Sequence, residues 1–168
     1  WIQEYAKTRE QPASKHSGMV PEHEAPIKPN PLQEQALHAL EKTRSNGFTA
    51  GLVVLPTGSG KTLTALTLVT RVSKKYKPLV VIIVCPFLNL CHQWEKELLK
   101  FGITPISCFD KRVNWDSKLD RGYQRLKAGI IEILTIVTTN ATYMGEIFQA
   151  KLKSRVTDGE LHHLLIAD

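Results

Sequence analysis

The residues from Leu55 to Thr62 bring together glycines, a lysine and a hydroxyl in an order suited to binding a chain of phosphates. Gly58 and Gly60 allow the backbone to curl so that its N–H groups point inward and form a concave anion site. Lys61 can reach the terminal phosphates of a nucleotide, and the Thr62 hydroxyl can bind Mg²⁺. A helix beginning near Gly60 would add the positive end of its dipole. The spacing therefore predicts a phosphate-binding loop.

Such a loop needs a strand leading into it and a helix leading out of it. Residues 52–55 form a short apolar run that predicts the strand, and residues 63–72 predict the helix. The full pattern has Gly where this chain has Leu55, so the bare pattern could arise by chance in a loop. The predicted strand and helix on either side favour a functional phosphate loop over that alternative.

The rest of the chain alternates predicted helices with predicted strands. Asn30 and Pro31 mark a helix start, and Gly47 ends that helix. Strands separated by helices require crossover connections, which predict an α/β fold with a parallel sheet covered on both faces. The further strands are predicted at residues 79–85, 106–109, 130–138 and 164–167, and the further helices at residues 88–101, 117–127 and 143–152.

The composition is that of a soluble globular protein with a basic surface. The chain has 22 Lys and Arg against 16 Asp and Glu, a formal net charge of +6. This excess favours a polyanionic partner, although it does not separate DNA from RNA. Three cysteines without CxxC spacing argue against a disulfide scaffold or a zinc site and are typical of a reducing cytosol. With no apolar run of membrane-spanning length and no secretory signal, we expect a cytoplasmic or nucleoid-associated protein.

The first part of the chain differs from the rest. Residues 1–28 hold few periodic apolar positions and several Pro and Gly residues. This pattern predicts a linker or extension from an upstream region, with room for one short helix at residues 1–8. The predicted domain therefore covers residues 29–168.

With Leu55 in place of Gly, the loop resembles the form found in superfamily-2 helicases. Residues 31–37 are similar to the family's Gln-containing segment, which implies that the Gln33 amide hydrogen-bonds the adenine edge. Without the resemblance, Gln33 would be an exposed helix residue. Residues 164–168 resemble the Walker B strand, which implies that Asp168 holds Mg²⁺ together with Thr62 and acts in catalysis with Lys61. The nucleotide contacts implied by the resemblance are Gln33, Pro56, Thr57, Gly58, Ser59, Gly60, Lys61 and Thr62.

Two further segments resemble the parts of this family that touch nucleic acid. Residues 85–94 are similar to motif Ia, and residues 137–143 to motif Ib, which implies contacts with backbone phosphates rather than bases. Without the family, Thr139 and Asn140 would be helix-capping residues, and Trp94 would pack in the core. Residues 111–115 mix basic and aromatic side chains, a combination that can bind single-stranded nucleic acid. A loop with a partly buried Trp115 explains this combination better. The implied nucleic-acid contacts are Pro86, Phe87, Asn89, Thr139 and Asn140.

The resemblance covers most of the chain and predicts a partial three-layer RecA-like P-loop NTPase domain, the first such domain of a superfamily-2 DNA helicase or translocase. It implies ATP and Mg²⁺ as cofactors, duplex DNA rather than RNA as the track, and an upstream nuclease or recognition domain or subunit, as in restriction, defence or repair systems. In the family a Glu follows the position of Asp168 and orients the attacking water. Since the chain ends before that Glu, we expect it as given to bind nucleotide but hydrolyse it poorly.

Two alternatives of other classes remain open. A P-loop phosphotransferase, or kinase, would use the same loop, but it would need a pocket for an acceptor substrate that the sequence does not reveal. A nucleotide-binding module without turnover would need only the loop. Hydrolysis stimulated by DNA, phosphate transfer to a small acceptor, and binding without turnover would distinguish the three.

Overall fold

The computed structural model describes residues 28–156 and 161–168. The helix suggested at residues 1–8 and nearly all of the predicted linker lie outside these residues. The predicted domain is therefore described almost completely, and it can be compared with the expectations element by element.

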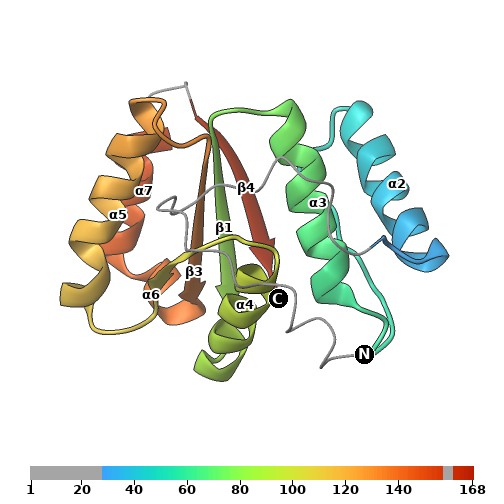
Figure 1. Ribbon diagram of the computed structural model, residues 1–168, viewed down its shortest axis with the longest axis horizontal. Helices are drawn as coiled ribbons and strands as arrows, with labels where there is room; N and C mark the ends of the chain where they lie inside the picture. Colours follow the sequence, from blue (N-terminus) through green and yellow to red (C-terminus); the bar gives the residue numbers. More distant parts are fainter. Residues whose placement is uncertain (1–27, 157–160) are drawn as a thin grey trace, which may run out of the picture.

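The centre of the fold is a four-stranded sheet in which every paired strand is parallel and the order is β2-β3-β1-β4. Figure 1 shows β3, β1 and β4 side by side. The two central strands, β1 and β3, consist mostly of aliphatic and β-branched residues and are buried almost throughout. This is typical of parallel strands covered on both faces. The predicted α/β class with a parallel sheet is confirmed. The strands are β1 (Leu79–Cys85), β2 (Ile106–Cys108), β3 (Ile133–Thr139) and β4 (His162–Ala167).

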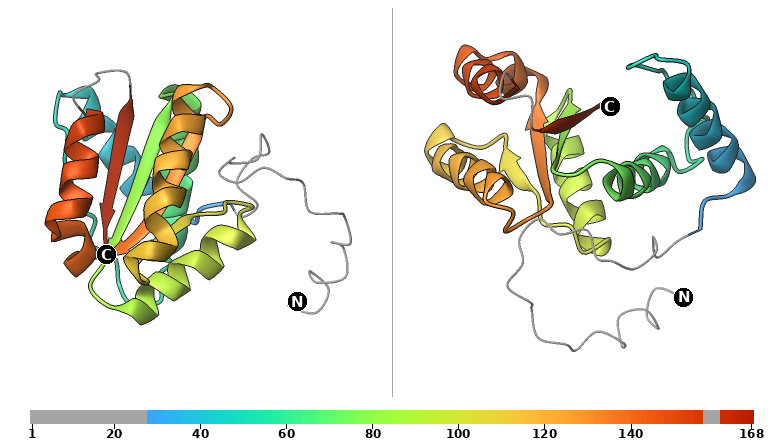
Figure 2. Two further views of the ribbon diagram at one scale, coloured as in Figure 1. Left: turned by 90° about the vertical axis from the view of Figure 1, so that its left-hand side faces the viewer. Right: turned by 90° about the horizontal axis from the view of Figure 1, so that it is seen from above.

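Helices cover both faces of the sheet, which makes the three predicted layers (Figure 2). Side chains of β1 alternate between the faces: Val81 and Ile83 pack in the core beneath α3 and α4, while Val80 and Ile82 pack in the core beneath α5 and α7. The helices are α2 (Pro31–Ser45), α3 (Lys61–Lys75), α4 (Leu88–Lys100), α5 (Arg112–Lys127), α6 (Asn140–Met144) and α7 (Glu146–Val156).

Helix α2 lies beside α3, on the outside of the layered core (Figures 1 and 2). It begins as the sequence predicts, because the Asn30 side chain accepts from the N–H of Gln33 in a reciprocal capping box. Arg71 of α3 bridges the two helices by ion pairs with Glu34 at 2.7 Å and Glu41 at 3.1 Å. The capping box and the ion pairs together fix where α2 sits relative to the start of α3.

The strand predicted at residues 52–55 is wrong. These residues form no strand, and Leu52 and Val54 are 88% and 82% exposed. A strand is stable only when a neighbouring strand pairs with its backbone, and within the described residues the edge strand on this side, β4, pairs with β1 alone. The apolar run has residue types that are common in strands, but in the described part of the chain it has no neighbouring strand with which its backbone can pair.

The boundaries of several other elements also differ from the prediction. Helix α5 begins at Arg112, so Trp115 is a helix residue that is only 4% exposed, not part of a loop. β3 starts at Ile133, since Gly129 makes a turn with φ 67° after α5. The helix predicted at residues 143–152 is interrupted at Gly145, which separates α6 from α7. In each case a turn or a cap, not the apolar pattern, sets the boundary.

Candidate nucleotide-binding site

The carboxyl ends of the strands bring together segments that are far apart in the sequence. Cys85 at the end of β1 pairs with Thr139 at the end of β3. The backbone N–H of Asp168 donates to the carbonyl of Val84 at 3.0 Å, which holds Asp168 beside the end of β1. Helix α3 begins at this same edge (Figure 1). In open parallel sheets this edge is where ligands bind, because loops and helix N-termini converge there.

The loop of residues 55–62, called the 55–62 loop below, has the predicted backbone at its two glycines, although no strand leads into it. Gly58 and Gly60 adopt left-handed φ values of 78° and 84°, a region that other residues rarely enter. The N–H of Ser59 donates to the carbonyl of Pro56 at 3.2 Å and closes the turn. Within the described residues the N–H groups of Lys61 and Thr62 donate to no acceptor. These are the unpaired donors of a helix N-terminus, and they are available to an anion.

Lys61 folds back over the 55–62 loop. Its Nζ atom lies 3.3 Å from the carbonyl oxygens of both Leu55 and Pro56. These distances are at the long end for hydrogen bonds, so a phosphate oxygen could compete for the ammonium. Thr62 follows in the first turn of α3 and is partly exposed. The structure thus brings the predicted phosphate-binding lysine and the predicted hydroxyl to the mouth of the same loop.

Gln33 connects α2 to the 55–62 loop. Its Nε2 atom donates to the carbonyl of Ser59 at 2.8 Å and approaches that of Gly60 at 3.4 Å, while Oε1 accepts from the N–H of Asn30 at 2.9 Å. The alternative of an exposed helix residue is wrong, because Gln33 is 3% exposed. Both ends of the amide are engaged with protein atoms in this structure, and the contact with adenine stays a prediction.

Asp168 has a side-chain partner that the sequence did not reveal. The indole N–H of Trp94, on α4, donates to Oδ2 of Asp168 at 2.9 Å. Trp94 is 3% exposed and also belongs to the core beneath α3 and α4, so its predicted role in packing is confirmed. No local signal in the sequence could indicate the second role, since it joins residues from separate elements.

The predicted nucleic-acid contacts lie at the same carboxyl edge, on two turns. Pro86, Phe87 and Asn89 are exposed around the start of α4, and Phe87 is 66% exposed. Thr139 caps α6, its Oγ1 accepting from the N–H of Thr142 at 3.3 Å, which confirms the capping alternative for this residue. Asn140 is the first residue of α6 rather than its cap. The contacts of these residues with nucleic acid stay predictions.

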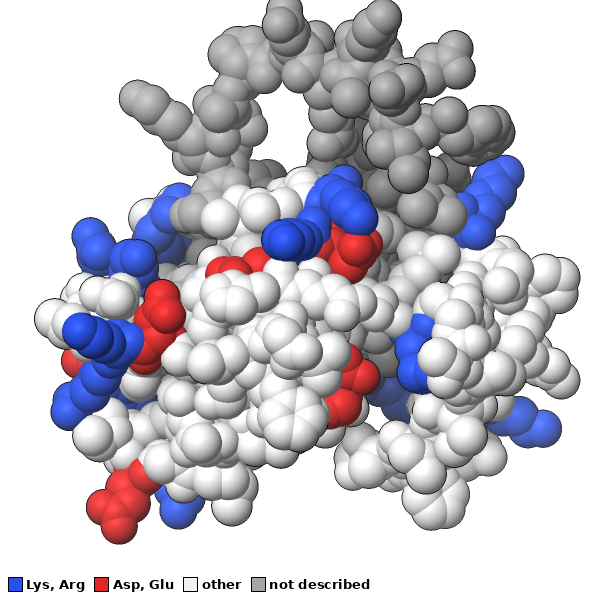
Figure 3. Space-filling view, turned by 90° about the horizontal axis from the view of Figure 1, so that it is seen from below, with Lys and Arg blue, Asp and Glu red and all other residues white. Residues whose placement is uncertain are grey.

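The charges on this face are mixed. Figure 3 views the carboxyl edge, where Lys and Arg side chains are dispersed and several Asp and Glu side chains lie among them.

In residues 28–156 and 161–168 no group of three or more His, Cys, Asp and Glu could hold a metal ion. No helix in the same part of the chain is long and apolar enough to cross a membrane.

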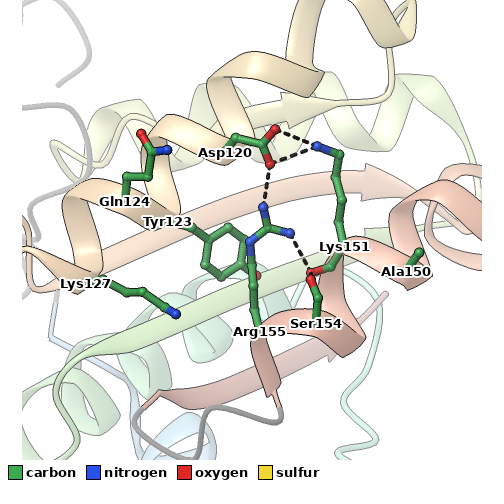
Figure 4. Close-up of a pocket in the computed structure, with 8 residues that line it drawn as sticks. All are labelled: Asp120, Tyr123, Gln124, Lys127, Ala150, Lys151, Ser154 and Arg155. Carbon is green, nitrogen blue, oxygen red and sulfur yellow. Dashed lines mark hydrogen bonds and ion pairs between the residues drawn. The ribbon is translucent and has the colours of Figure 1, made fainter.

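Two hollows of the described surface lie away from the 55–62 loop. One, of about 560 Å³, opens between α5 and α7 (Figure 4), and the other, of about 510 Å³, lies along α4. In the first, Asp120 accepts from Lys151 and Arg155, and Arg155 stacks 4.6 Å from the centre of the Tyr123 ring. The hydrogen bond from Lys151 holds the pKa of Asp120 below its usual value. These ion pairs link α5 to α7.

The fold and the groups at the carboxyl edge of the sheet together define the class of protein. A parallel sheet between two helical layers, with a glycine turn opening a helix at the carboxyl edge, is the architecture of nucleotide-binding α/β proteins. A family model described as "Type III restriction enzyme, res subunit" matches residues 26–168, and the chain belongs to this family. The family is that of the N-terminal RecA-like domain of superfamily-2 helicases, so the predicted relationship is confirmed, and the chain is a helicase-like ATPase motor domain. No individual curated protein matches the chain.

Proposed function

We propose that this domain binds ATP with Mg²⁺ at the 55–62 loop and that the intact protein uses hydrolysis there to drive movement along duplex DNA. One observation carries the proposal. The left-handed turn at Gly58 and Gly60 presents the unpaired N–H groups of Lys61 and Thr62 at the sheet edge where Asp168 follows β4. Helix N-termini placed in this way bind phosphates through backbone donors and the helix dipole.

In the proposed site Lys61 binds the terminal phosphates, and Thr62 and Asp168 hold Mg²⁺. A hydroxyl and a carboxylate are hard oxygen donors, which suits Mg²⁺, and the remaining positions would be filled by water and phosphate oxygens. The residues present thus fit the ion. Bound Mg²⁺ would neutralise charge that develops on the phosphates during transfer. The protein's own part is to orient the phosphates and to supply donors that are already in place.

Gln33 would read the adenine in addition to holding the 55–62 loop. Its amide nitrogen donates mainly to the carbonyl of Ser59, at 2.8 Å, and the contact with Gly60 is weaker at 3.4 Å. The second amide proton and the second lone pair of Oε1 remain for a base edge. The same side chain would then touch the base and support the loop that holds the phosphates.

Nucleic acid would lie across the two turns at the carboxyl edge. Pro86, Phe87 and Asn89 surround the start of α4, and Thr139 and Asn140 the start of α6. Backbone N–H groups at helix starts bind phosphate oxygens without reading bases, as a moving motor requires. The net charge of +6 supports a polyanionic track. The proposed track is duplex DNA rather than RNA, and the proposed partner is an associated nuclease or recognition part, in the cytoplasm or nucleoid.

The test is ATP hydrolysis by the full-length protein without nucleic acid and with duplex DNA, single-stranded DNA or RNA. We expect duplex DNA to stimulate turnover and Lys61→Ala to abolish it. Lys74→Ala is the matched control, because Lys74 is an exposed lysine in the last turn of the same helix. Turnover that depends on Lys61 but ignores every nucleic acid would favour a phosphotransferase. Nucleotide binding without turnover would favour a binding module.

A further inference from the structure

The indole N–H of Trp94 donates a hydrogen bond to a carboxylate, although a backbone carbonyl would be a sufficient acceptor. The other tryptophan in the described part of the chain, Trp115, is equally buried and donates to the carbonyl of Asp110 at 3.2 Å. Trp94 instead donates to Oδ2 of Asp168 at 2.9 Å. Hydrogen bonds to a charged acceptor are shorter and stronger than those to a neutral one. The contact therefore orients the carboxylate as well as satisfying the indole.

Asp168 is held at two points and is left with one free oxygen. Its backbone N–H donates to Val84 at 3.0 Å, which ties the end of β4 to β1. Its Oδ2 accepts from Trp94, whose ring is immobilised in the core beneath α3 and α4. Within the described residues Oδ1 accepts no hydrogen bond. The carboxylate can therefore present Oδ1 in one orientation.

We infer that Trp94 is a positioning residue for the divalent cation: it holds Oδ2 of Asp168 so that Oδ1 is preset to bind Mg²⁺. The inference rests on the proposed function, since it concerns the same site. A carboxylate that turns freely loses rotational entropy when it binds an ion, and a fixed partner removes that cost. Trp94 acts through Asp168 and touches neither the nucleotide nor the ion.

The test measures metal-dependent nucleotide binding rather than turnover. Trp94→Phe keeps an aromatic ring in the core and removes the N–H. We expect the Mg²⁺ concentration that half-saturates binding of a fluorescent ATP analogue to rise about tenfold or more, as for other outer-sphere partners of metal ligands. Binding of the same analogue in EDTA should be unchanged. In an Asp168→Asn background the Trp94 change should add nothing further, because the two act through one interaction.

Trp115→Phe is the matched control. It removes an indole N–H of equal burial from the other core and should leave the Mg²⁺ midpoint unchanged. An equal shift in both variants would overturn the inference, because it would reflect loosened packing. If wild-type protein binds the analogue in a Lys61-dependent way but Trp94→Phe leaves the midpoint unchanged, the positioning role alone is wrong. If wild type shows no Mg²⁺-dependent binding, the proposed function falls and the inference with it.

A second measurement covers the case in which Trp94→Phe does not fold. In ¹⁵N-labelled wild-type protein saturated with the analogue, Mg²⁺ should shift the indole N–H signal of Trp94, because its acceptor becomes a metal ligand. The signal of Trp115 should stay in place. A Trp94 signal that does not move when Mg²⁺ binds would overturn the inference without any substitution.

Discussion

Gln33 of α2 and Ser59 of the 55–62 loop, 26 residues apart in the chain, are joined by a hydrogen bond of 2.8 Å from the side-chain amide to the backbone carbonyl. The same amide accepts from the N–H of Asn30, so the cap of α2 and the turn before α3 share one side chain. The conformation of the proposed phosphate site therefore depends on a helix that contributes no residue to the loop itself.

Replacing Gln33 by Ala should destabilise the domain. The change removes the hydrogen bonds to the partly buried carbonyl of Ser59 and from the N–H of Asn30, and each such bond contributes about 0.5–1.5 kcal/mol to the free energy of unfolding. Urea unfolding of both proteins would measure this. Gln35→Ala is the control, because Gln35 is exposed on the same helix and its loss should change stability by less than about 0.5 kcal/mol. Weaker ATP binding with unchanged stability would instead mean that Gln33 acts on the base alone.

The glycines of the 55–62 loop should differ in their tolerance of alanine. Gly58→Ala forces a left-handed backbone on Ala, at about 1–2 kcal/mol, with no atom within 4 Å of the new Cβ. Gly60→Ala adds a clash, because its Cβ would lie 2.4 Å from Nε2 of Gln33. We expect Gly60→Ala to lower the thermal midpoint more than Gly58→Ala, and both to weaken nucleotide binding.

Gly129→Ala serves as the control for the glycine series. Gly129 also has a positive φ, 67°, and open space around its Cβ position, but it lies after α5. The Gly129→Ala variant should lose about as much stability as Gly58→Ala but should keep its affinity for nucleotide. Equal losses of affinity in all three variants would contradict a specific role for the 55–62 loop.

The ion pairs of Asp120 should make stability depend on pH in acid. The folded-state pKa of Asp120 lies below its ordinary 3.8, chiefly through the hydrogen bond from Lys151. Its contribution is thus complete above pH 3.8 and disappears as the pH falls through the lower, folded pKa. Because the Asp120 side chain is 37% exposed, we expect Asp120→Asn to cost no more than about 1 kcal/mol at pH 7.

Chemical unfolding at a series of pH values would check the Asp120 prediction. The difference between wild type and Asp120→Asn should shrink below about pH 4, where the carboxylate begins to take up its proton. Asp110→Asn is the control, since Asp110 is exposed and makes no ion pair within the described residues. A difference that persists unchanged into strong acid would contradict the assignment of the stabilisation to charge.

The cysteines of this chain should be inert in the folded protein. Cys85, Cys91 and Cys108 are all buried, and burial raises the pKa of Cys85 and Cys108 to about 12. Thiolate, the reactive form, is therefore scarce at pH 8 as well as inaccessible. Alkylation followed by peptide mapping should label them only after denaturation. Ser45→Cys, at an exposed position, should react at once. Rapid labelling of Cys85 in native protein would contradict the buried core.

Short-range features were predictable from the sequence. The capping of α2 by Asn30, the buried runs of β1 and β3 and the glycine turn at Gly58 and Gly60 depend on neighbouring residues, so local patterns reveal them. The order of the segments was enough to predict a parallel sheet and a phosphate loop at its edge. The motifs at residues 55–62, 85–94 and 164–168 were enough to identify the family.

Interactions between distant segments could be read only from the tertiary structure. The run at residues 52–55 has strand-like composition but no paired neighbour, and Gln33 has the pattern of an exposed residue but lies buried against the 55–62 loop. Trp94 was expected in the core, yet its N–H binds Asp168, 74 residues away. Pairing and hydrogen bonding across the fold depend on where other elements pack. The sequence by itself therefore determined which groups could do the chemistry, and the packing of α2 and α4 against the sheet edge decided how those groups are held.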